Sequence, residues 1–148
     1  MNDHTLRVLE YDKIAAIVSG FAASEAGKAA VSALVPSGDA AVVKTRLRET
    51  GEFLDILRSG ETPPLDGISD VGPAVRKLRV SGITLSPVEL LNTATTLGVG
   101  RRVRQFFQRF VEKGAGTRPQ TPLLWARAGE IRPLKQIEEA VLSAIDNK

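Results

Sequence analysis

Two strongly helical segments are separated by a loop with the sequence Pro63-Pro64-Leu65-Asp66-Gly67-Ile68-Ser69-Asp70. Each proline fixes its own φ and disfavours helix in the residue before it, so the preceding helix has to end here. Gly67 suits a turn, Ile68 can fill a core position, and Ser69 or Asp70 can cap the next helix. The loop therefore predicts a junction between two helices, whose aspartates shape the turn and cap a helix rather than carry out chemistry.

The rest of the sequence predicts further helices. Apolar residues recur at helical spacing, and several segments begin with a capping residue. Ser86-Pro87-Val88-Glu89 combines Ser as N-cap, Pro at the first helical position and Glu two residues later, the pattern of a capping box. The only strand candidate is short, at residues 79–85. We therefore expect an all-α protein, an irregular multi-helix bundle, with helices over about residues 11–21, 24–34, 40–59, 71–80, 86–113, a short one from 121, and 134–146.

The two longest expected helices contain glycines in their interiors, where a glycine costs about 1 kcal/mol relative to alanine. Gly51 is expected to mark close packing of its helix against a neighbour. Gly98 and Gly100 are expected to weaken the middle of the longest helix and to allow a kink or a break there.

The chain has 148 residues, which fits a single helical domain over residues 1–148. The most linker-like stretch runs from Gly114 to Gln120, so residues 114–121 are a candidate sub-boundary. No apolar run approaches the length of a membrane span, and no signal peptide is recognisable at the N-terminus. We expect a cytoplasmic protein with no membrane partner.

Composition excludes several kinds of catalytic site. The sequence has no cysteine and one histidine, His4, which rules out thiolate metal sites and histidine-rich metal sites. The Gly-x-x-x-x-Gly-Lys-[Ser/Thr] phosphate-binding loop and the Gly-x-Ser-x-Gly nucleophile motif are also absent. We therefore expect no catalytic residue, no metal ligand and no cofactor within this chain, which would not be an enzyme by itself.

The best functional candidate is a basic cluster on the longest expected helix. Residues 71–113 contain eight basic and two acidic residues. Val103, Phe106, Phe107 and Phe110 share one face that should pack inward, which leaves a basic face suited to phosphate contacts but not to reading bases. The alternative is a solvated helix whose cations lie near its C-terminal end. The candidate phosphate-contacting residues are Arg101, Arg102, Arg104, Arg109 and Lys113.

Three segments resemble a known family, the type-two MutS proteins, which are MutS-like, Smr-bearing ATPases and endonucleases of recombination suppression or ribosome rescue. The segments are Leu9-Glu10-Tyr11-Asp12-Lys13, the loop from Pro63 to Asp70, and Leu85-Ser86-Pro87-Val88-Glu89-Leu90-Leu91. The resemblance extends from Leu9 to about Asp146. It implies that the chain is an N-terminal fragment, part of the helical core domain, without the ATPase, clamp and Smr domains.

The resemblance also implies a role and partners. The fragment would be non-catalytic and would transmit ATP-driven changes between the ATPase and the clamp that embraces nucleic acid. ATP and Mg²⁺ would bind elsewhere in the parent protein, which would form a homodimer and act on DNA or on a ribosome. Two alternatives stay open: a protein–protein or oligomerisation module that uses the alanine-rich helix and the Trp125 segment, or a weak phosphate-backbone-binding domain that uses Arg101 to Lys113.

Overall fold

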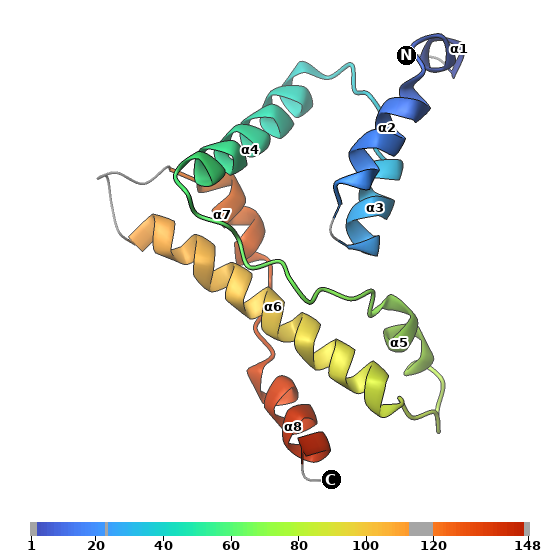
Figure 1. Ribbon diagram of the computed structural model, residues 1–148, viewed down its shortest axis with the longest axis vertical. Helices are drawn as coiled ribbons and strands as arrows, with labels where there is room; N and C mark the ends of the chain where they lie inside the picture. Colours follow the sequence, from blue (N-terminus) through green and yellow to red (C-terminus); the bar gives the residue numbers. More distant parts are fainter. Residues whose placement is uncertain (1–2, 23, 113–119, 147–148) are drawn as a thin grey trace. The chain divides into compact units, whose positions relative to one another are not determined.

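All regular structure in the described residues is α-helical, which confirms the predicted fold class (Figure 1). The computed structural model describes residues 3–22, 24–112 and 120–146. No strand occurs in these ranges, and the strand candidate at residues 79–85 forms turns and coil. The helices are α1 (Asp3–Val8), α2 (Tyr11–Gly20), α3 (Glu25–Ser32), α4 (Ala40–Arg58), α5 (Gly72–Lys77), α6 (Pro87–Glu112), α7 (Pro122–Gly129) and α8 (Lys135–Asp146).

The chain divides into two compact units, Met1–Leu47 and Arg48–Lys148, so α4 begins in the first and ends in the second. The single domain over residues 1–148 stays a prediction. The candidate sub-boundary at 114–121 falls mostly on residues 113–119, which lie outside the described residues.

The first unit contains a pair of adjacent helices, α2 and α3. The Tyr11 hydroxyl donates to the Leu34 carbonyl at 3.1 Å. Ser24 caps α3, because its hydroxyl accepts a hydrogen bond from the Gly27 N–H at 3.1 Å. Helix α1 was not expected from the sequence. None of the described residues of this unit is buried.

The start of α4 agrees with the capping residue read from the sequence, and the start of α5 does not. Asp39 accepts hydrogen bonds from the Ala41 and Val42 N–H groups at 2.8 and 3.3 Å and so begins α4. Asp70 accepts from the Gly72 N–H at 2.9 Å just before α5, but the N-cap of α5 is Val71, which makes no side-chain capping bond, so the prediction that Asp70 is the cap is wrong. Helix α5 is also shorter than predicted. It ends at Lys77 rather than near Val80, and the chain turns through Gly82, whose φ is +81°.

The loop from Pro63 to Asp70 lies against α6. Pro63 is buried, and Gly67 has a φ of +89°, which favours glycine. A Cβ at Gly67 would also come within 3.1 Å of the Thr95 methyl group, so both the conformation and the space require glycine. The Ser69 N–H donates to the Thr96 hydroxyl at 3.1 Å. The loop is thus a helix junction that is fastened to the middle of α6.

Helix α6 runs unbroken from Pro87 to Glu112 through both of its glycines, so the expected break is wrong. The glycines instead make room for neighbours. A Cβ at Gly98 would lie 2.8 Å from a carboxylate oxygen of Glu138, and one at Gly100 would lie 3.4 Å from Ile131. Gly51 differs, because a Cβ there would meet nothing within 4 Å. The prediction that Gly51 marks close packing is therefore wrong.

The core of the second unit is formed by α4, α6 and α7. The predicted inward face of α6 is confirmed, because its three phenylalanines are buried. The Phe106 and Phe107 rings pack edge to face with centroids 5.3 Å apart. Trp125 is partly buried against this core. The buried cluster consists of Ile56, Phe106, Phe107, Phe110 and Ala128.

Candidate functional site

Arg101, the first residue of the predicted basic cluster, forms a two-pronged ion pair with Glu138 on α8. Its Nε and Nη2 atoms donate to the two carboxylate oxygens at 3.1 and 2.8 Å. The two side chains are only 25% and 13% exposed, so water screens the pair incompletely. The Glu138 hydrogen bonds raise the pKa of Arg101, and the same bonds lower the pKa of Glu138. Arg101 therefore fastens α8 to α6.

Arg104 binds the end of α7. One of its guanidinium nitrogens donates to the backbone carbonyls of Gly129 and Ile131, at 3.0 and 2.6 Å. Gly129 is the last residue of α7, where unpaired carbonyls give the helix end a partial negative charge. A cation at this position satisfies those carbonyls and stabilises the turn that leads from α7 to α8.

The remaining predicted residues are placed differently. Arg102 and Arg109 are exposed, and the Arg109 guanidinium lies over the Phe106 ring at 5.1 Å from its centroid. Lys113 lies outside the described residues. Arg101 and Arg104 thus make hydrogen bonds within the protein, whereas Arg102 and Arg109 are exposed to solvent. Phosphate contact by any of the five residues stays a prediction.

Glu52 holds the start of α7, a role that the sequence pattern did not indicate. Its carboxylate accepts hydrogen bonds from the Leu123 N–H, at 3.2 and 3.0 Å from its two oxygens, and from the Leu124 N–H at 2.9 Å. A carboxylate at a helix N-terminus satisfies free N–H groups and complements the helix dipole. The N-cap residue Thr121 makes no side-chain capping bond, and its buried hydroxyl has no partner. Glu52 therefore replaces the local cap.

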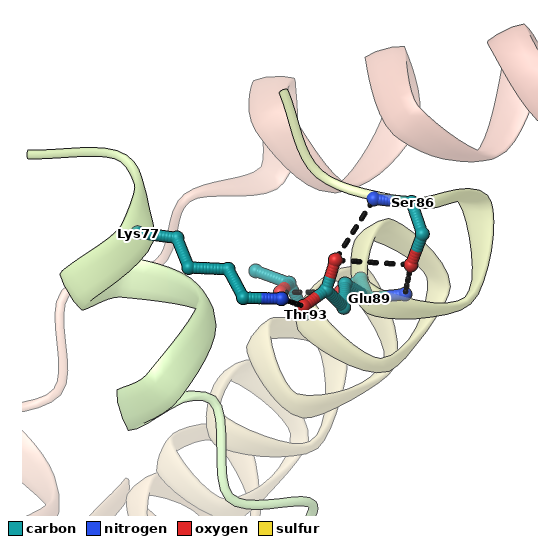
Figure 2. Close-up of polar contacts among 4 residues, drawn as sticks. All are labelled: Lys77, Ser86, Glu89 and Thr93. Carbon is teal, nitrogen blue, oxygen red and sulfur yellow. Dashed lines mark hydrogen bonds and ion pairs between the residues drawn. The ribbon is translucent and has the colours of Figure 1, made fainter. Parts of the chain in front are cut away.

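A second polar cluster fixes the junction between α5 and α6 (Figure 2). The predicted capping box is confirmed: the Ser86 N–H donates to Glu89 at 2.9 Å, and the Glu89 N–H donates to the Ser86 hydroxyl at 3.3 Å. Lys77, on α5, forms an ion pair with the same carboxylate. Lys77 and then Ser86 together lower the pKa of Glu89 to about 2. This cluster is a structural fastening, in which Glu89 stays ionised.

No group of three or more His, Asp or Glu side chains able to hold a metal ion occurs among the described residues. His4 is exposed on α1. Within the described helices, none is both long and apolar enough to cross a membrane. Two of the sequence-predicted residues, Arg101 and Arg104, thus join α6 to α8 and to the end of α7. Glu52, which the sequence did not indicate, joins α4 to the start of α7.

Comparison with known proteins finds extensive sequence similarity to one kind of protein. The chain is 38% identical over 141 residues to Endonuclease MutS2 of Shouchella clausii, and 35% identical over 146 residues to Endonuclease MutS2 of Clostridium beijerinckii. It is 32% identical over 147 residues to the protein of that name from Geobacillus thermodenitrificans. These matches cover 95–99% of the chain but only 17–18% of each relative. No family model matches the sequence.

Proposed function

We propose that this chain, a homologue of about one-sixth of the Endonuclease MutS2 proteins, is a non-catalytic helical module of a MutS2-type protein. In this role it belongs to the helical core that connects an ATPase with the parts that embrace nucleic acid. ATP, Mg²⁺ and nuclease chemistry then belong to other parts of the longer protein. The longer protein acts in the cytoplasm as a homodimer on DNA or on a ribosome.

The observation that carries this proposal is the set of partners to which the charged side chains bind. The most distinctive charged groups, Arg101, Arg104 and Glu52, all bind helix ends or a carboxylate of a neighbouring helix. Such bonds position helices relative to one another, and they are the bonds expected of a connecting module. In residues 48–148 apolar surface is also left over, including Leu54, Leu57 and Leu134. A surface with many exposed apolar side chains is typical of one that another part of an assembly covers.

Replacement of the matching segment in a relative tests this proposal. In the experiment, the 141 matched residues of Shouchella clausii Endonuclease MutS2 are exchanged for this chain, and DNA cleavage and ATP hydrolysis are measured. A control protein lacks the segment altogether. If the segment supports the fold of the longer protein, the chimera should regain the stability and the activities that the deletion variant loses. A chimera that folds as stably as the relative but remains inactive would contradict the proposal.

A second candidate function is weak contact with nucleic-acid phosphates, and the exposure of Arg102 and Arg109 favours it. Binding of a fluorescent DNA duplex to the 148-residue chain would then fall steeply with salt. It would also fall when Arg102 and Arg109 are replaced by glutamate, with a matched control at the exposed Arg132. Binding that does not depend on salt, or that the Arg132 control weakens equally, would exclude this function.

A further inference from the structure

Five large apolar side chains along the junction between α5 and α6 are each 44–65% exposed. Isolated apolar residues on a surface are normal, but a group of large ones within fourteen residues is characteristic of a binding surface. We call this group the corner patch, and it consists of Val75, Leu78, Val80, Ile83 and Val88.

The backbone that carries the corner patch is fixed by contacts within the protein. Ala74 of α5 is buried, at 6% exposed, whereas Val75 and Leu78, three residues apart, are 48% and 56% exposed. The ion pair of Lys77 with Glu89 then ties α5 to the start of α6 (Figure 2). Because the backbone beneath the patch is already fixed, a partner that covers it loses little free energy to ordering the junction.

The charges around the corner patch select its partner. Arg76 and Arg79 are both exposed near the apolar residues. Of the two acidic residues nearby, Asp70 accepts a hydrogen bond from the Gly72 N–H, and Glu89 is engaged by Lys77 and Ser86. A second copy of the chain, docked symmetrically, would bring the arginines of both copies together, which is unfavourable. The surface is instead complementary to a segment that presents apolar side chains flanked by carboxylates.

We propose that the corner patch docks an acidic, amphipathic segment of the same longer polypeptide. This inference rests on the proposed function, since it needs a protein of which this chain is one part. The matched relatives support it, because 82–83% of their length lies outside the matched region and can supply such a segment. The corner patch would thus be an internal interface that positions α5 and α6 against the rest of the protein.

Hydrogen exchange in the chimera described above tests this docking. Amides of residues 74–90 should exchange about tenfold or more slowly in the chimera than in the isolated 148-residue chain, because docking suppresses local opening. The double variant Leu78→Asp, Ile83→Asp should remove that protection. The control Ile137→Asp alters an apolar side chain of similar exposure (49%) on α8 and should leave the protection unchanged. Arg76→Glu with Arg79→Glu should weaken it, most clearly at low salt.

Three results would overturn the inference. Equal exchange in the chimera and the isolated chain would show that nothing covers the corner patch. Protection of the isolated chain that rises with its concentration would assign the patch to a second copy, and protection only by anionic vesicles would assign it to a lipid surface.

An active chimera whose corner patch is unprotected refutes the docking alone, whereas an inactive, folded chimera refutes the proposed function. If the chimera does not fold, exchange is measured on the 148-residue chain mixed with the Shouchella clausii protein that lacks its matched segment.

Discussion

Replacing Arg101 by methionine should loosen α8 from α6 and destabilise the second unit. The substitution removes two charge-assisted hydrogen bonds to Glu138, at 3.1 and 2.8 Å, but keeps an apolar side chain of similar length. Hydrogen bonds to charged groups contribute about 1.5–3 kcal/mol, and fully exposed ion pairs about 0.2–1 kcal/mol. Because these two side chains are 25% and 13% exposed, we expect a loss between these limits, about 1–2 kcal/mol.

The chain contains its own reporter for this measurement. Trp125 is its single tryptophan and packs against the core of the second unit, so its fluorescence follows unfolding of residues 48–148 in urea. The expected loss corresponds to a fall in melting temperature of roughly 4–16 °C. A double-mutant cycle with Glu138→Gln should give a coupling free energy of about 1 kcal/mol.

The matched control is Arg102→Met, one residue along the same helix at an exposed position. It should change the free energy of unfolding by less than about 0.5 kcal/mol. Equal effects of the two substitutions, or a coupling energy near zero between Arg101 and Glu138, would refute the reasoning that this ion pair holds α8 in place.

Gly51→Ala should stabilise the chain by about 0.5–1 kcal/mol in urea unfolding, since the added methyl meets nothing and alanine favours helix. Gly98→Ala should raise the stability less or not at all, because its Cβ would lie 2.8 Å from Glu138 Oε1 and displace that carboxylate. An equal gain in stability at both glycines would contradict the close packing of Gly98 against Glu138. Glu52→Gln should lower the free energy of unfolding by about 1 kcal/mol and raise the rate of amide hydrogen exchange at the start of α7, where the carboxylate accepts two N–H groups. An unchanged exchange rate there would count against the capping role of Glu52. The pKa of Glu89 is lowered in the folded state from 4.5 to about 2, so its stabilisation is complete above pH 4.5 and is lost as the pH falls toward 2. Urea midpoints from pH 7 to pH 2.5 should therefore fall less steeply for Glu89→Gln than for the unaltered chain, and identical slopes would refute this assignment.

The features that could be predicted from the sequence are those encoded by neighbouring residues. Ser24, Asp39 and Ser86 were identifiable as helix caps because a cap and the N–H group that it binds lie within four residues of each other. The inward aromatic face of α6 follows from its spacing alone. These local signals were sufficient for the all-α class and for most helix starts.

The site could be predicted only in part, because its bonds join residues far apart in the chain. Arg101 is 37 residues from Glu138, and Glu52 is 71 residues from Leu123. A sequence pattern identifies Arg101 as a charged residue on a helix, but the choice between a phosphate and a partly buried carboxylate as its partner depends on which helix packs beside it. The same limit explains why Gly51 and Gly98 could not be distinguished.

The proposed role as a non-catalytic module is tested most directly by the activity of the 148-residue chain itself. ATP hydrolysis and nicking of plasmid DNA should be measured with the purified chain and, side by side, with Shouchella clausii Endonuclease MutS2 at the same molar concentration. We predict that the folded chain, at any added Mg²⁺ concentration, gives only the background rate of the buffer. Turnover that co-purifies with the chain and disappears when the chain is unfolded would contradict a non-catalytic role.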